Sequence, residues 1–132
     1  MSASDRGWPV RLGTILARMV GLSTAASGAA LVVAPRPSLC RVGAGTTEPA
    51  PLLFGAIGMF MAMSGGILVD GCRTDPPSKL ALRWSLAQKV GVAGAICLGV
   101  RKGQLGRQAL GVAAFDGGSA VLIAWLLLNA ET

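Results

Sequence analysis

Between Pro49 and Val69 the chain reads PAPLLFGAIGMFMAMSGGILV, a run without a single charged residue. A helix rises about 1.5 Å per residue and the hydrocarbon core of a bilayer is about 30 Å thick, so about 20 apolar residues are needed to cross it. The run is long enough. It therefore predicts a transmembrane helix, which we place at about residues 48–69.

Three more helices are predicted around this one, and their ends are marked by proline and by capping residues. Pro35 should end the first helix, because a proline disfavours the helical conformation in the residue before it. Thr46 or Thr47 should cap the second helix, and Ser78 the third. The three flanking helices are predicted at about residues 9–34, 79–100 and 108–128.

Composition agrees with a membrane protein. Of the 132 residues, 52% are hydrophobic and 14% are charged, whereas soluble domains average about 25% charged. Four spans and their loops use nearly the whole chain, so residues 1–132 are predicted to form one domain. We predict an all-α fold, an integral membrane four-helix transmembrane bundle. A cleaved signal peptide is the alternative for the first helix, but Arg18 interrupts its apolar stretch.

The net charge of +6 comes from basic residues that lie mostly at helix ends and in short loops. This placement favours contact with lipid head groups and argues against nucleic acid as a partner. In a four-span chain the two sides carry equal numbers of basic residues, so the positive-inside rule gives no orientation. The two sets are Arg6, Arg11, Arg73, Lys79 and Arg83 on one side and Arg36, Arg41, Arg101, Lys102 and Arg107 on the other.

Small residues recur at intervals of about four on every predicted helix. In lipid no hydrophobic force draws helices together, so they associate through close packing at such residues. The stripes therefore predict a tight bundle, and one stripe could instead make a dimer or dock on a larger complex. The predicted packing residues are Gly13, Ala17, Gly21, Ala25, Gly58, Ala62, Gly66, Gly91, Ala95, Gly99, Ala114 and Gly118.

Two charged residues, Lys89 and Asp116, fall inside predicted spans. Counted from the loop that joins their helices, the two residues differ in depth by about 4–5 Å at 1.5 Å per residue, within reach of a lysine side chain. We predict an intramembrane ion pair. It could form a proton or substrate relay, or it could fix the register of two helices; Lys89 could also extend toward the Arg83 end instead. Ser119, one turn beyond Asp116, is the only obvious polar companion.

Residues that would form a catalytic, cofactor or metal site are missing from the pattern. The chain has no histidine and no tyrosine, and it carries neither a nucleophile elbow nor a phosphate loop. Cys40, Cys72 and Cys97 form no CxxC pair and are expected to be free thiols. We therefore assign no catalytic residue, no cofactor and no metal ligand, and an enzyme is not the favoured interpretation.

The pattern resembles the uncharacterised small four-helix membrane proteins of bacteria that include the DoxX-like group. The resemblance rests on Ala34-Pro35 at the end of the first helix, on Phe54-Gly55-Ala56-Ile57-Gly58 in the second, and on Lys89 with Asp116. It covers nearly the whole chain and implies the fold. The family's functions are mostly unknown, so the resemblance implies no site residues.

Three functions follow from these observations. The first is a structural accessory or scaffold subunit of a membrane complex, because packing stripes are present without a catalytic set. The second is a small homodimeric transporter that uses Lys89 and Asp116. The third is a membrane enzyme that acts on a lipid or a quinone, supported only by the region around Asp116. The expected partners are the bilayer and other membrane subunits or a second copy, in a bacterial plasma membrane or an organelle inner membrane.

Overall fold

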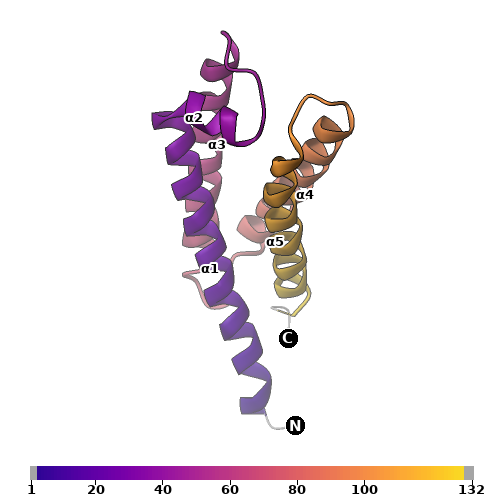
Figure 1. The fold of residues 1–132 in the computed structure, drawn as a ribbon. Coiled ribbons are helices and arrows are strands. Elements are labelled where there is room, and N and C mark those ends of the chain that lie inside the picture. The colour runs from indigo at the N-terminus through magenta and orange to yellow at the C-terminus, as the bar shows by residue number, and fades with distance from the viewer. Residues whose placement is uncertain (1–2, 130–132) are drawn as a thin grey trace.

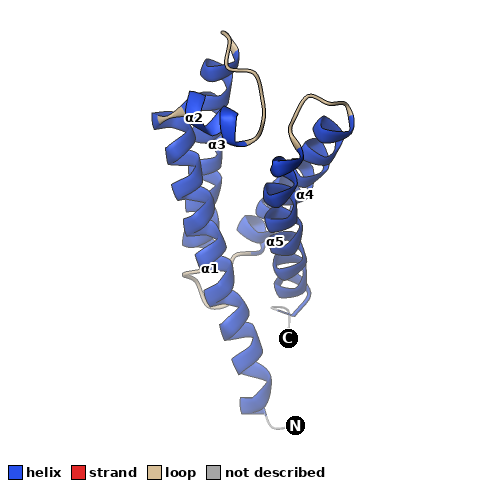
Figure 2. Cartoon of the chain, in the orientation of Figure 1, coloured by secondary structure: helices blue, strands red, loops and turns tan. Residues whose placement is uncertain are grey.

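The structure is a computed structural model that describes residues 3–129, and every regular element in that part of the chain is a helix (Figure 1, Figure 2). In chain order the elements are α1 (Ala3–Val33), α2 (Pro35–Arg41), α3 (Ala50–Gly71), α4 (Lys79–Arg101), the short 3-10 helix η1 (Arg107–Ala109) and α5 (Leu110–Asn129). The all-α prediction is confirmed.

The long helices form two pairs. α1 packs most extensively against α3, and α4 packs most extensively against α5. Smaller contacts between α3 and α4 and between α1 and α5 join the pairs. Consecutive long helices run in opposite directions, so α1 begins and α5 ends at the same end of the molecule, the lower end in Figure 1.

The hydrophobic core lies toward that lower end and draws on all four long helices. Leu68, Leu82, Ile123 and Leu126 are the largest fully buried side chains. They form one cluster with Ala17 and Cys72. At the opposite end, the loops after α2 and α4 are joined by a hydrogen bond from Gly106 N–H to the carbonyl of Val42 at 2.9 Å.

Three helices are long and apolar enough to cross a membrane: Gly7–Val33, Ala50–Gly71 and Arg107–Asn129. They correspond to three of the four predicted spans, and they indicate a membrane protein. α4 is as long as these, but it carries Lys79, Arg83, Lys89 and Arg101 and is not among the three. The fourth crossing therefore stays a prediction.

Most helix ends lie close to their predicted positions. α1 ends at Val33, and Ala34 leaves the helical region with φ −135° and ψ 65° directly before Pro35. Ser78 caps α4 as expected, because its hydroxyl accepts a hydrogen bond from the N–H of Ala81. α4 ends at Arg101, where Gly103 takes φ +69°, a conformation that favours glycine.

Three details of the predicted elements are wrong. Helix α1 begins at Ala3 and contains Pro9, although proline at that position has no N–H to donate to the preceding turn. Neither Thr46 nor Thr47 caps α3, because its first residue follows Pro49 and no side chain makes a capping bond there. The segment between the first two predicted helices, residues 35–47, was not predicted to be helical but contains α2, which proline initiates readily because its φ is already helical.

The contact between α1 and α3 is made by small residues. A methyl group added to Gly28 would lie 2.5 Å from the Gly58 carbonyl oxygen and from the Ala62 nitrogen. One added to Gly65 would lie 2.5 Å from the Gly21 oxygen and from the Ala25 nitrogen. The two backbones therefore touch directly, which is how transmembrane helices associate tightly.

Only some of the predicted small residues pack against other parts of the chain. Gly13 packs on Trp125 and Leu126, Ala17 is buried in the core, and Gly99 packs on Leu105. A methyl group added to Gly66, Gly91 or Gly118 would meet no atom within 4 Å. Ala95 and Ala114 are exposed. The expectation that small residues pack within the chain on every helix is therefore wrong for Gly66, Gly91, Ala95, Ala114 and Gly118.

Candidate functional site

Lys89 and Asp116 lie on the faces of α4 and α5 that pack together. On α4 the buried residues include Ser85 and Lys89, one turn apart. On α5 they include Asp116 and Ser119. The structure brings Lys89 Nζ to 2.6 Å from Asp116 Oδ1, and their side chains are only 3% and 6% exposed. At this distance the two groups make a charge-assisted hydrogen bond.

A third helix supplies a partner that the sequence analysis did not identify. Lys89 Nζ donates a hydrogen bond to Thr24 Oγ1 at 2.7 Å, and the Thr24 hydroxyl donates in turn to the carbonyl of Val20 at 2.9 Å. Thr24 is buried on α1. The ammonium group therefore joins α1, α4 and α5, and so links the two helix pairs.

An aromatic ring lies beside the ammonium group. The ring centroid of Phe115 is 5.1 Å from Lys89 Nζ, a distance at which the ring face attracts a cation. Phe115 is the residue directly before Asp116, so α5 contributes both an anion and a ring to the same site. We call Lys89, Asp116, Thr24 and Phe115 the ammonium site.

Ser119, expected as a companion of Asp116, takes no part in the ammonium site. Its hydroxyl donates to the carbonyl of Phe115 at 2.7 Å, one turn back on its own helix. Such local bonds satisfy a buried hydroxyl without a partner from another helix. Asp116 therefore has Lys89 as its charge partner, and the site carries one positive and one negative group.

A second polar contact is made by the residue directly before Lys89 on α4. Gln88 accepts a hydrogen bond through Oε1 from the hydroxyl of Ser64 on α3. This bond lies in a groove of about 470 Å³ between α3 and α4, lined mainly by apolar side chains including Phe60 and Trp84. Consecutive residues of α4 thus bind different helices: Gln88 binds α3, and Lys89 binds α1 and α5.

The polar groups of the ammonium site are closed off from solvent, although Phe115 is 46% exposed. No buried side-chain nitrogen or oxygen among the described residues lacks a hydrogen-bond partner. Lys89 and Asp116 line neither the groove between α3 and α4 nor the groove at the end of α1. The arrangement is therefore suited to holding helices together, since its donors and acceptors are directed at one another and not into a cavity.

The cysteines lie apart from this site and are all free thiols, as expected. Cys40 and Cys97 are exposed, and Cys72 is buried at the end of α3. Burial raises the pKa of the Cys72 thiol, and the nearby positive charge of Arg18 opposes that rise. Comparison with known proteins adds no relative: no family model, curated protein or solved structure matches the chain.

Proposed function

We propose that the protein is a structural accessory or scaffold subunit of a membrane complex, built as a four-helix transmembrane bundle. The observation that carries this proposal is the closed ammonium site, in which Lys89 binds Asp116 and Thr24 and so ties three helices together. A buried ion pair that joins side chains of different helices is suited to fixing their register. A relationship to the DoxX-like group is likewise a proposal.

The same site supports α4 as the fourth crossing. Lys89 is the only charged residue between Trp84 and Val100, and its charge is matched by Asp116. An unpaired ammonium near the bilayer centre costs several kcal/mol, and pairing offsets much of that cost. Trp84 is 70% exposed near the start of α4, a position typical of residues at the membrane interface.

The outward faces of α4 and α5 offer a surface for a partner subunit. Methyl groups added to Gly91 or Gly94 on α4, or to Gly118 on α5, would meet no atom within 4 Å. Small residues on a lipid-facing surface allow another helix to approach closely. We therefore propose that a membrane subunit packs here, and the small residues that the chain itself leaves uncovered support this.

The test is purification of the native protein in mild detergent, followed by mass measurement of the intact assembly. We expect the protein to travel with other subunits in fixed stoichiometry, and Gly91→Leu to release them. Gly66→Leu on α3 is the matched control, because Gly66 also has open space beside it but lies on another helix. A lone homodimer whose transport activity depends on Lys89 or Asp116 would overturn the proposal.

The buried charges favour one other function, a small homodimeric transporter. Its test is ion flux in liposomes that contain the purified protein. A relay requires Asp116→Asn to abolish flux while helix content and oligomeric state stay unchanged. Thr24→Ser keeps the hydroxyl and Thr24→Val removes it, so the pair separates a structural role from transport. If the site is structural, Thr24→Val lowers stability more than Thr24→Ser does, and the unmodified protein shows no ion flux.

A further inference from the structure

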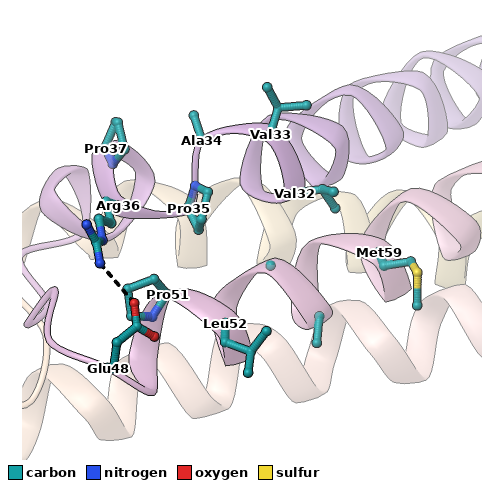
Figure 3. A pocket seen from close by; sticks show the side chains of 12 residues that line it. Val32, Val33, Ala34, Pro35, Arg36, Pro37, Glu48, Pro51, Leu52 and Met59 are labelled. Carbon is teal, nitrogen blue, oxygen red and sulfur yellow. Dashed lines mark hydrogen bonds and ion pairs between the residues drawn. The ribbon is translucent and has the colours of Figure 1, made fainter.

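An open groove lies at the end of the molecule opposite the core. It is formed by the end of α1, by α2 and by the start of α3, and its volume is about 890 Å³ (Figure 3). This volume lies within the range of small-molecule sites, about 300–1,000 Å³. Apart from Arg36 and Glu48, the lining is apolar, and the residues drawn in Figure 3 include Val32, Leu52 and Met59.

The groove is polar at one end only. Arg36 and Glu48 lie together at that end, and Met59 lies at the other (Figure 3). Along α3 the lining residues run from Pro51 to Met59, which is about 12 Å at 1.5 Å per residue. One leaflet of a bilayer has a hydrocarbon depth of about 15 Å. The groove therefore has the length and the polarity of one lipid chain with its head group.

The polar end carries one charge of each sign. Arg36 Nη2 donates to Glu48 Oε1 at 2.9 Å, and the two side chains are 65% and 63% exposed. Within the described residues, the other N–H groups of Arg36 and the second oxygen of Glu48 have no further partner. An exposed ion pair of this kind contributes little stability by itself, so both groups remain free to bind a ligand.

We propose that this groove binds a glycerophospholipid with a zwitterionic head group that carries a primary ammonium, the chemistry of phosphatidylethanolamine. The guanidinium of Arg36 binds the phosphate, and the carboxylate of Glu48 binds the ammonium. The acyl chain lies along the apolar wall that runs down α3. A purely anionic lipid would satisfy Arg36 but would meet the Glu48 carboxylate, and a choline head group has no N–H to donate to it.

This proposal needs only α1 and α3 to cross the membrane, and both are among the helices apolar enough to do so. It is independent of the accessory role and of α4, so either proposal can fail without the other. Gly55 offers a way to block the groove, because a methyl group added there has only the Leu31 carbonyl oxygen nearby, at 4.0 Å.

The experiment is native mass spectrometry of the protein purified with an equimolar mixture of phosphatidylethanolamine, phosphatidylcholine and phosphatidylglycerol with identical acyl chains. We expect phosphatidylethanolamine to be retained about fivefold more than either competitor, the scale of one charge-assisted hydrogen bond at an exposed site. Preferential retention of phosphatidylglycerol would overturn the assignment of Glu48. Equal retention of all three would overturn the site.

Matched variants locate the bound lipid. Gly55→Leu and Ala56→Leu place side chains in the groove and should lower retention, whereas Gly66→Leu, in open space on α3 and outside the groove, should leave it unchanged. Glu48→Gln should remove the preference over phosphatidylcholine, and Arg73→Gln, from the exposed Arg73–Asp70 pair at the other end, should not. Circular dichroism checks that each variant is folded. Retention that is insensitive to both groove variants would overturn the proposal.

Discussion

A lysine ammonium buried among three helices is stable only while its partners remain in place. Lys89 has a carboxylate, a hydroxyl and an aromatic ring around it, supplied by Asp116, Thr24 and Phe115. Removal of one charge leaves the other buried without compensation, which costs more than removal of both. The ammonium site should therefore respond very differently to single and to double substitution.

We expect Asp116→Leu to lower the free energy of unfolding by about 3–5 kcal/mol, because the Lys89 ammonium then remains buried and unpaired. The double variant Lys89→Met/Asp116→Leu should recover most of that loss. Reversible unfolding in detergent, followed by tryptophan fluorescence, measures both. Arg73→Met breaks an exposed ion pair and should cost less than about 1 kcal/mol. A double variant as unstable as Asp116→Leu would contradict the assignment.

The buried thiol of Cys72 gives a prediction that depends on pH. Burial raises the pKa of the Cys72 thiol, so at a given pH less of its reactive thiolate forms in the folded protein than in the unfolded chain. In variants that keep one cysteine each, alkylation of Cys72 near neutral pH should be slower than that of Cys40, because Cys72 is buried and Cys40 is exposed. Equal rates would show that Cys72 is accessible.

The raised pKa of Cys72 also determines how the free energy of unfolding changes with pH. As pH rises above the ordinary thiol range, the unfolded chain loses the Cys72 proton while the folded chain keeps it. The unfolded state then binds fewer protons, so the free energy of unfolding falls with rising pH. Cys72→Ser removes this dependence and Cys40→Ser does not, and unfolding curves at alkaline pH distinguish them.

Among single residues, the sequence identified the buried charges but not the hydroxyl group that binds one of them. Lys89 and Asp116 stand out because charged residues are rare in apolar segments, and the structure places them together. Thr24 gave no signal, because a threonine in such a helix usually bonds the preceding turn of its own backbone, as it also does here. A search for hydroxyl side chains on every predicted helix at the depth of Lys89 would have identified Thr24.

Between elements, the contact that most constrains the fold is the one between α1 and α3. The predicted stripe of small residues on α1 advanced by four at each step, but a helix has 3.6 residues per turn, so such a stripe drifts around the axis. From Gly7 onward, the buried positions of α1 are instead Gly13, Ala17, Gly21, Thr24 and Gly28. The same drift explains why Gly65 of α3 touches α1 and why Gly66 does not.

This adjacent pair of glycines makes a matched test. A methyl group at Gly65 would meet backbone atoms of Gly21 and Ala25 at 2.5 Å, so Gly65→Ala should lower the free energy of unfolding by about 1–3 kcal/mol. Gly66→Ala has open space and should be neutral or stabilising by up to about 1 kcal/mol through helix propensity. Thermal unfolding in detergent measures both. Equal effects would contradict the packing.

Helix α2 was missed for a local reason. Two prolines at Pro35 and Pro37 and two glycines at Gly43 and Gly45 read as a loop. Proline breaks a helix only in its interior, and at the first positions it is favoured. The rule that correctly ended α1 at Pro35 thus concealed the helix that begins there.

For the whole molecule, the proposed fourth crossing predicts that the two ends of α4 lie on opposite sides of the membrane. In a cysteine-free protein, Asp75→Cys before α4 and Gly103→Cys after it should react with a membrane-impermeant maleimide from opposite sides. Both should react once the membrane is permeabilised, which serves as the control. Reaction of both from the same side of intact membranes would show that α4 does not cross.

The architecture was predictable because long apolar runs leave few alternatives. Three spans were visible as uninterrupted or nearly uninterrupted hydrophobic segments. The division of the long helices into two pairs was not predictable, because stripes of small residues occur on both covered and uncovered helix faces. Only contacts between segments distant in sequence, such as Thr24 with Lys89, distinguish those faces.

The order of synthesis gives the ammonium site a further meaning. Lys89 leaves the ribosome 27 residues before Asp116, so for that interval α4 carries a lysine whose carboxylate has not yet been made. The pair α1 and α3 is complete by then and can enter the bilayer alone. We therefore expect α4 to enter the bilayer together with α5, because only then is the charge of Lys89 matched by Asp116.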